Sequence, residues 1–220
     1  MDYKSVFDII GPVMVGPSSS HTAGACRIGN IAHILFDDEP EIVNVYLYES
    51  FAKTYRGHGT DVAICGGVLG MEPDDDHLHE SLLIAKERGM TVRFIPLSDP
   101  SQHPNTAKIV MRKGNRKMVV IGESIGGGSV KIVEIDGIKV DVMGGIDTLV
   151  VFHHDKHGMI AKVSTILSQF NLNIASMKVD REFRGKDAYM VITVDEPVEP
   201  KVVSAILEID NIVDVKYIRK

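Results

Sequence analysis

Hydrophobic and polar residues alternate along several short stretches of the chain, and this pattern predicts strands. Val43, Val45 and Leu47 alternate with Asn44 and Tyr46, as expected of a strand with one buried face. Four further stretches predict strands in the same way: residues 91–96, 106–112, 117–124 and 130–135. Asp136-Gly137 then separates two apolar runs and predicts a hairpin, because two-residue hairpin turns favour Asp-Gly.

Apolar residues at helical spacing predict the helices of the same region. The first helix begins near Ala25 and carries apolar residues every three or four positions. Residues 61–70 are apolar and glycine-rich, which predicts a short, closely packed helix, and residues 77–89 predict a helix ended by Gly89. Residues 51–60 are polar and predict a loop. Residues 1–146 are therefore predicted to form one α+β domain with a mixed or antiparallel sheet.

A second domain is predicted for residues 147–220, after the Gly144-Gly145 pair. Its strand and helix patterns follow the order βαββαβ, which is typical of a ferredoxin-like fold. The predicted elements are a strand at 149–154, a helix from Met159, strands at 173–179 and 189–194, a helix at 200–209 and a strand at 212–218.

Composition narrows the classes of partner. The 220 residues carry a net charge of -6 without a run of lysine and arginine, so no nucleic-acid partner is expected. Residues 1–10 lack the pattern of a signal peptide, and no window approaches the roughly 20 apolar residues of a membrane span. We expect a cytoplasmic protein with no membrane partner.

Cys26 and Cys65 are the two cysteines, and neither belongs to a CxxC pair. Buried free thiols are the expected state of both. An iron-sulfur cluster usually needs several thiolates. If iron chemistry is involved, another chain must therefore bring most of the ligands.

The loop from Gly11 to Gly29 is the strongest candidate for chemistry. Its serines precede His21 and stand where a helix N-cap belongs. Unpaired N–H groups and hydroxyls at a helix N-terminus can hold a small anion such as a carboxylate, with His21 beside it to move a proton. A well-capped helix start without further function explains the same residues, and local physics does not decide between the two.

Other polar positions support weaker hypotheses. His58 lies between two glycines and invites pairing with His21, although a solvated loop histidine is a common alternative. The residues from Ser124 to Gly128 form either an anion cradle or a β-bulge. Asn105 and Thr106 either line a pocket or cap a turn. The three histidines of residues 153–157 lack a carboxylate or thiolate partner, so no metal site is predicted.

Two other enzyme classes fit poorly. A serine hydrolase is rejected because no serine stands in the strand-turn-helix context of a nucleophile elbow, and the adjacent Ser20 and His21 do not suit the geometry of a nucleophile and its base. A pyridoxal enzyme lacks a lysine that the sequence singles out for a Schiff base.

Several ordered motifs resemble one family. The segments are GPSSSHTAG (Gly16 to Gly24), YRGHGTD (Tyr55 to Asp61), HPNTAKI (His103 to Ile109) and GESIGGGSVKI (Gly122 to Ile132). Together with a C-terminal segment similar to an ACT domain, they resemble the beta subunit of the bacterial iron-sulfur-dependent L-serine dehydratases. The resemblance covers nearly the whole chain, as a serine dehydratase beta-chain domain at 1–146 and an ACT domain at 147–220.

This resemblance implies a function. The chain would be one subunit of a lyase of amino-acid catabolism and gluconeogenesis that converts L-serine to pyruvate and ammonia, inactive without an alpha subunit that holds a [4Fe-4S] cluster. His21 and His58 would handle the protons, without an assignment of acid and base between them. The expected substrate-binding residues are Ser18, Ser19, Ser20, Thr22 and Gly57.

The ACT segment departs from its family at one position. His157 stands where ACT domains usually have a proline, in the loop that ends at Gly158. ACT domains commonly pair side by side and bind amino acids, which makes Asn171, Asn173 and Gly158 candidates for effector binding and implies self-association. A domain that only mediates assembly is equally compatible with the sequence.

A second reading comes from the first domain. This domain also resembles the allosteric substrate-binding domain of some phosphoglycerate dehydrogenases. The alternative function is therefore a non-catalytic, amino-acid-sensing regulatory protein, which would tolerate the loss of His21 with weakened binding only.

Overall fold

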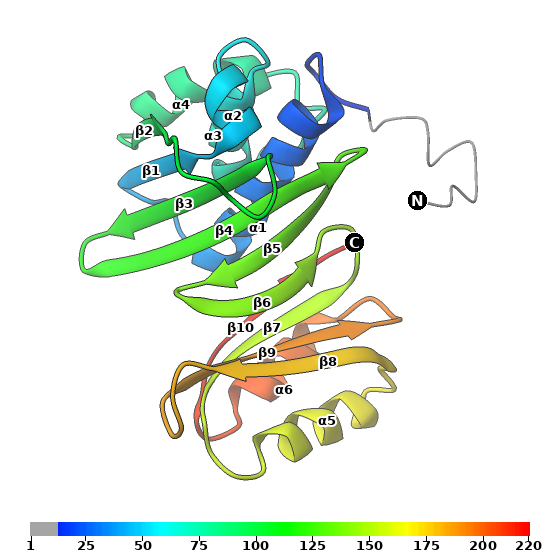
Figure 1. Ribbon diagram of the computed structural model, residues 1–220. Helices are drawn as coiled ribbons and strands as arrows, with labels where there is room; N and C mark the ends of the chain where they lie inside the picture. The colour runs from blue at the N-terminus through cyan, green and yellow to red at the C-terminus, as the bar shows by residue number, and fades with distance from the viewer. Residues whose placement is uncertain (1–12) are drawn as a thin grey trace. The chain divides into compact units, whose positions relative to one another are not determined.

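The computed structural model describes residues 13–220 and divides the chain into two compact units, Met1–Asp136 and Gly137–Lys220 (Figure 1). Residues 1–10, where the sequence predicts no signal peptide, lie outside the described residues. So do Gly11 and Pro12, which open the predicted anion-binding loop. No helix within residues 13–220 is long and apolar enough to cross a membrane.

The first sheet is mixed, as the sequence predicts. Within the first unit its strand order is β2-β1-β3-β4-β5. Strand β1 pairs in parallel with β2 and antiparallel with β3, and the β3–β4 and β4–β5 pairs are antiparallel. These strands are β1 (Ile42–Leu47), β2 (Thr91–Pro96), β3 (Thr106–Lys113), β4 (Arg116–Gly126) and β5 (Ser129–Ile135). Strand β6 (Ile138–Met143) follows within the residues of the second unit.

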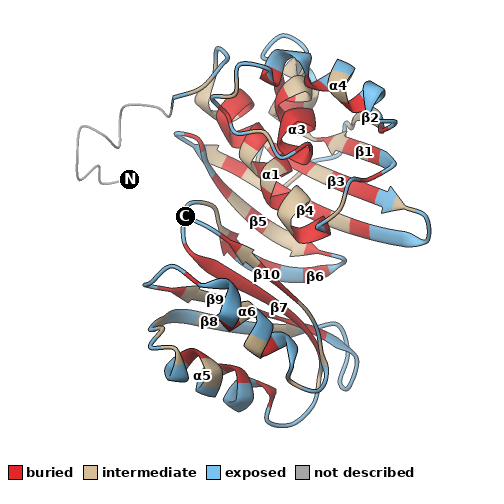
Figure 2. Ribbon diagram, turned by 180° about the vertical axis from the view of Figure 1, so that it is seen from behind, coloured by how far each residue is buried: buried red, intermediate tan, exposed pale blue. Residues whose placement is uncertain are grey.

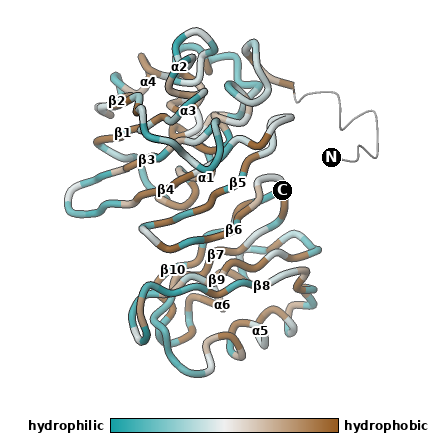
Figure 3. Tube along the Cα trace, viewed as in Figure 1, coloured by the Kyte–Doolittle hydropathy of each residue, from teal (hydrophilic) through white to brown (hydrophobic). Residues whose placement is uncertain are grey.

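Side-chain alternation explains these strands. Val43, Val45 and Leu47 of β1 are fully buried, and the residues between them are partly exposed, because successive side chains of a strand point to opposite faces. Asp136 and Gly137 adopt positive φ angles of 49° and 87°, the backbone form that a type I′ turn requires. Figure 3 shows apolar residues along the strands and hydrophilic residues at the turns.

Helices cover one face of this sheet, and two of them approach unusually closely (Figure 2). A Cβ added to Gly67 would lie 2.0 Å from the Cys26 carbonyl oxygen, and one added to Gly29 would lie 2.4 Å from the Ile64 carbonyl oxygen. Only glycine fits at such a backbone contact. The helical elements are the π-helix η2 (Ser19–Gly24), α1 (Ala25–Phe36), α2 (Glu49–Thr54), α3 (Thr60–Val68), the 3₁₀-helix η3 (Leu78–Glu80) and α4 (Ser81–Glu87).

The prediction of a polar loop at residues 51–60 is wrong for residues 51–54, which belong to α2, and for Thr60, which begins α3. Phe51 is fully buried, and the N–H groups of Ser50 and Phe51 both donate to the carbonyl of Pro104, at 2.9 and 3.4 Å. A six-residue helix is too short to form from local propensity. These contacts with a segment fifty residues later stabilise it, and the local pattern does not contain them.

The second unit contains the predicted ferredoxin-like arrangement. Its four-stranded sheet has the order β10-β7-β9-β8, with every neighbouring pair antiparallel. Buried aliphatic residues of the sheet and of both helices form its core. The elements are β7 (Thr148–His154), α5 (Met159–Gln169), β8 (Ile174–Arg181), β9 (Asp187–Val194), α6 (Pro200–Leu207) and β10 (Ile212–Ile218).

Candidate active site

The serine-rich loop folds as a π-helical turn that runs directly into α1. Ser18 is its N-cap, with an extended backbone and a side-chain oxygen that accepts the backbone N–H of His21 at 3.2 Å. The predicted capping role is therefore confirmed for Ser18. Ser19 and Ser20 instead lie within the turn. π-Helical turns are rare in proteins, and those that occur are often found at functional sites.

Both ring nitrogens of His21 lie within hydrogen-bonding distance of serine hydroxyls. Nδ1 lies 3.1 Å from the Ser20 oxygen and 3.4 Å from the Ser18 oxygen. Nε2 lies 3.1 Å from the oxygen of Ser50, on helix α2. The imidazole is thus held between η2 and α2, with a hydrogen-bonding partner for whichever nitrogen carries the proton.

His58 packs against His21, as the sequence predicts. The two rings meet edge to face, with centroids 4.9 Å apart and planes at 88°, and Phe51 lies 5.2 Å from His21 in a similar orientation. His21 is only 9% exposed, whereas His58 is exposed. The pair therefore joins a buried imidazole to one that solvent or a ligand can reach.

Burial lowers the pKa of His21, and the nearby His58 lowers it further. Burial disfavours the charged imidazolium, and a second positive charge on His58 would repel it. His21 is therefore neutral at pH 7 and has a lone pair that can accept a proton.

Thr22 ties the serine turn to the His58 loop. Its hydroxyl donates to the carbonyl of His58 at 3.2 Å. A Cβ at Gly16 would lie 2.5 Å from the Thr22 side chain, and Gly16 has a φ of 147°. Gly57 is exposed beside His58. The structure thus brings Ser18, Ser20 and Thr22 to the histidine pair.

Sequence reasoning missed Ser50, and no signal in the pattern marks it. It lies in the short helix α2, which the polar composition conceals. Its importance comes entirely from the contact with His21, a residue 29 positions earlier.

Ser124 lies beneath the serine turn. Its side-chain oxygen is fully buried and has no hydrogen-bond partner among residues 13–220, and a Cβ at Gly24 would lie 2.1 Å from it. Its backbone N–H donates to the Asn105 carbonyl at 3.0 Å. The β4–β5 register shifts between Ser124 and Gly126, so the predicted bulge is present here. Thr106 caps the preceding turn through its hydroxyl, which donates to the His103 carbonyl at 2.6 Å.

The two cysteines do not fit an iron-sulfur cluster. Each thiol is buried and faces a backbone carbonyl, Cys26 that of Met71 at 3.3 Å and Cys65 that of Ser81 at 3.5 Å. Burial raises the pKa of both thiols to about 12, so neither is the thiolate that binds metal. Within residues 13–220 no three His, Cys, Asp or Glu side chains gather as a metal site.

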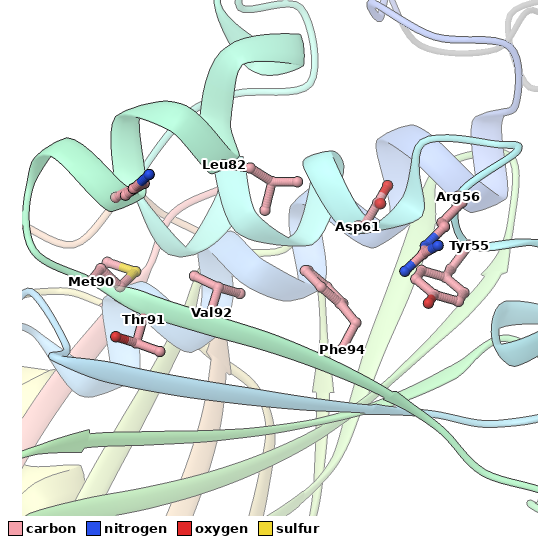
Figure 4. Close-up of a pocket in the computed structure, with 9 residues that line it drawn as sticks. Tyr55, Arg56, Asp61, Leu82, Met90, Thr91, Val92 and Phe94 are labelled. Atoms are coloured by element: carbon pink, nitrogen blue, oxygen red, sulfur yellow. The ribbon is translucent and has the colours of Figure 1, made fainter.

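A pocket of about 560 Å³ lies between β2 and the helices that carry Asp61 and Leu82 (Figure 4). Tyr55, Arg56 and Asp61 line it from the loop and from α3, and Phe94 lines it from β2, stacked against Tyr55 at 6.1 Å. Neither His21 nor His58 lines this pocket. The packed pair of His21 and His58, with the serines hydrogen-bonded to His21, rather than this cavity, therefore marks the candidate site for proton chemistry.

The three effector candidates have structural contacts in the second unit. Gly158 precedes α5 with a φ of 82°, and Asn171 follows it with a φ of 56°. Asn173 donates from its backbone to Glu196 at 2.8 Å and from its side chain to Asp195 at 2.6 Å. The three residues therefore have structural roles at the ends of helix α5 and in the loop that follows it. Effector binding at these residues stays a prediction.

Comparisons with known proteins match both units. The model of the serine dehydratase beta chain family matches residues 5–88, and that of the ACT domain matches residues 148–211. The chain is 44% identical over 218 residues to the probable L-serine dehydratase beta chain of Bacillus subtilis, covering 99% of each chain. It is 40% identical over 219 residues to the L-serine dehydratase beta chain of Peptoniphilus asaccharolyticus, covering 99% of this chain and 98% of that one.

A shorter match reaches another enzyme. The D-3-phosphoglycerate dehydrogenase of Methanocaldococcus jannaschii is 32% identical over 136 residues, which is 62% of this chain and 26% of that enzyme. The two beta chains, by contrast, match from end to end at 40% identity or more. The chain therefore belongs to the family of L-serine dehydratase beta chains.

Proposed function

We propose that this chain is the beta subunit of an L-serine dehydratase that converts L-serine to pyruvate and ammonia with an alpha subunit. The observation that carries this proposal is the pair of His21 and His58, held beside the serine hydroxyls of η2. The relatives of the same length bear the name of this enzyme's beta chain, which supports the choice of substrate.

The reaction needs a base, an acid and an anchor for the carboxylate. A base removes the proton from Cα, and the C3 hydroxyl leaves with a proton as water. The resulting enamine becomes an imine, which water hydrolyses to pyruvate and ammonia. His21, kept neutral by its surroundings, and His58, exposed beside it, can supply the proton transfers. The hydroxyls of Ser18, Ser19, Ser20 and Thr22, with the backbone at Gly57, would bind the substrate carboxylate.

The proposed cofactor is a [4Fe-4S] cluster on the alpha subunit. Such a cluster would act there as a Lewis acid on the leaving hydroxyl. The buried, protonated thiols of this chain do not suit its ligation, so its ligands would come from the partner. Two free cysteines are usual in a reducing compartment, which supports a cytoplasmic location.

The match to phosphoglycerate dehydrogenases favours a second candidate, an amino-acid-sensing regulatory protein. In such a protein the serine turn would bind its ligand without reaction. In the dehydratase, by contrast, His21 is part of the turnover.

The deciding experiment measures pyruvate formed anaerobically from L-serine after iron-sulfur reconstitution. The assay compares this chain alone, a cysteine-rich candidate alpha chain alone, and the two together. We expect activity only in the mixture, and its loss on His21→Ala. No turnover in a mixture whose cluster and complex are both verified would refute the dehydratase and leave the sensor as the better account.

The ACT unit carries a separate proposal. We infer that it mediates self-association and binds an amino acid near Asn171, Asn173 and Gly158. Calorimetry of the full-length chain with L-serine and other amino acids, repeated with Asn173→Ala, tests the effector. Heat that Asn173→Ala does not reduce would place the binding elsewhere.

A further inference from the structure

The surroundings of His21 bear on a question that the proposed function leaves open, namely which of its nitrogens accepts a proton. A neutral imidazole carries one N–H and one lone pair, and its hydrogen-bond partners select between the two tautomers. Because the ring is 9% exposed, protein groups, rather than water, make that choice.

Two hydroxyls lie on the Nδ1 side, and one of them has a fixed role. The Ser18 oxygen already accepts the backbone N–H of His21 at 3.2 Å. Its own O–H can then donate to Ser20, whose oxygen is 3.4 Å away, or to Nδ1 at the same distance. Ser20, 3.1 Å from Nδ1, can donate in turn. On this side of the ring, Ser18 can therefore donate to Ser20, and Ser20 can donate to Nδ1. This arrangement favours the tautomer in which Nδ1 carries the lone pair.

One hydroxyl lies on the Nε2 side. The Ser50 side chain contacts Nε2 at 3.1 Å, and within residues 13–220 it has no other hydrogen-bond partner. Its backbone is held by the N–H group, which donates to the carbonyl of Pro104 at 2.9 Å. Ser50 thus presents an oriented oxygen that can accept a proton held on Nε2.

We propose that Ser50 is a positioning residue that holds the proton of His21 on Nε2 and leaves Nδ1 as the proton acceptor on the side of the serine turn. A substrate carboxylate that takes the O–H donors of Ser18 and Ser20 would free the Nδ1 lone pair next to the substrate. Nε2–H stays bonded to Ser50 throughout, so the ring keeps its orientation. This inference rests on the proposed dehydratase function for its catalytic meaning, but the tautomer itself is a property of this chain.

The tautomer is measured on the full-length chain with ¹⁵N-labelled histidine by two-bond ¹H–¹⁵N correlation at neutral pH, with His21 assigned from the signals lost in His21→Ala. We expect the wild-type chain to show a protonated Nε2 and an unprotonated Nδ1. Ser50→Ala should shift both nitrogens toward the averaged values of mixed tautomers. Ser50→Thr, which keeps a hydroxyl, should retain the wild-type pattern.

Thr54→Val is the matched control, because it removes a hydrogen bond from the same helix without touching the histidine. It should also retain the wild-type pattern. A proton on Nδ1 in the wild-type chain would overturn the proposal, and so would an unchanged spectrum in Ser50→Ala. An equal shift in Thr54→Val would assign the effect to the helix rather than to the hydroxyl, and would overturn it too.

A second measurement connects the tautomer to turnover. In the reconstituted two-chain enzyme, Ser50→Ala should lower kcat about 10- to 100-fold, as is typical for the partner that orients a functional histidine, with KM little changed. Absence of turnover in the wild-type mixture would refute the proposed function alone, since the tautomer is read without the partner. Full activity of Ser50→Ala in an active mixture would refute the role of Ser50.

Discussion

Burial and a neighbouring histidine both lower the pKa of His21, with burial the larger cause. Replacing His58 by glutamine removes the charge repulsion but leaves the ring buried against Phe51. We therefore expect the pKa of His21 to rise in His58→Gln and to stay below the ordinary histidine value. An NMR titration of the His21 ring proton in the full-length chain measures both values.

The lowered pKa of His21 also makes the stability of the fold depend on pH. A histidine whose pKa is lower in the folded state adds stability above its unfolded pKa, and that stability is lost as pH falls through the folded value. His58→Gln should narrow this window, so the free energy of unfolding should fall less steeply with acid than in the wild-type chain. A His21 pKa at or above the ordinary value in the wild-type chain would contradict the burial argument.

At this scale the sequence predicted some contacts and missed others. Helix-start composition identified Ser18 as a cap, and flanking glycines pointed to His58 as a partner of His21. Ser50 had no such signal, because its contact depends on a helix that forms only when Phe51 is buried and Pro104 accepts its N–H groups. A local sequence pattern can predict hydrogen bonds between residues that are near one another in the chain. The contact between Ser50 and His21 joins residues 29 positions apart, so the pattern does not predict it.

Helices α1 and α3 approach each other at glycines, which makes their contact sensitive to a single methyl group. A Cβ on Gly67 would lie 2.0 Å from the Cys26 carbonyl and 2.7 Å from the Asn30 nitrogen, both backbone atoms that cannot rotate away. We expect Gly67→Ala to lower the free energy of unfolding by about 1–3 kcal/mol, despite the better helix propensity of alanine.

Gly57→Ala is the control for this substitution. A Cβ there would meet only the Thr54 carbonyl, at an ordinary 3.7 Å, and we expect a change of stability within about 0.5 kcal/mol. Urea denaturation of both variants gives the comparison. Equal stability of Gly67→Ala and the wild-type chain would show that the two helices can separate without loss.

Elements with a strong period were predictable, and short ones were not. Alternation in β1 and the Asp136-Gly137 turn indicated strands and a hairpin that the structure contains, and the βαββαβ order identified the second fold. The six-residue α2 and the π-turn η2 were missed, since too few residues repeat to define a period. Both carry residues of the candidate site, so the region of greatest functional interest was the least predictable from its pattern.

For the whole molecule, the chain is expected to hold only part of an active site. In the proposed function, His21, His58 and the serine hydroxyls would supply proton transfer and anion binding. Cys26 and Cys65 are buried thiols whose pKa values of about 12 keep them protonated. If the cluster belongs to the alpha subunit, these cysteines are dispensable for iron binding. Their hydrogen bonds to the backbone carbonyls of Met71 and Ser81 assign them a packing role instead.

The variant Cys26→Ala/Cys65→Ala tests this division of labour. Mixed with the alpha chain, it should give the same iron content per complex as the wild-type chain and comparable turnover of L-serine, with a lower free energy of unfolding because two buried sulfur atoms are lost. In the unmodified native chain both thiols should resist a thiol reagent at pH 8 and react once urea unfolds it, because burial withholds the reactive thiolate. A complex that loses its cluster with the double variant, while still assembling, would place iron ligands on this chain and contradict the assignment of the cluster to the partner.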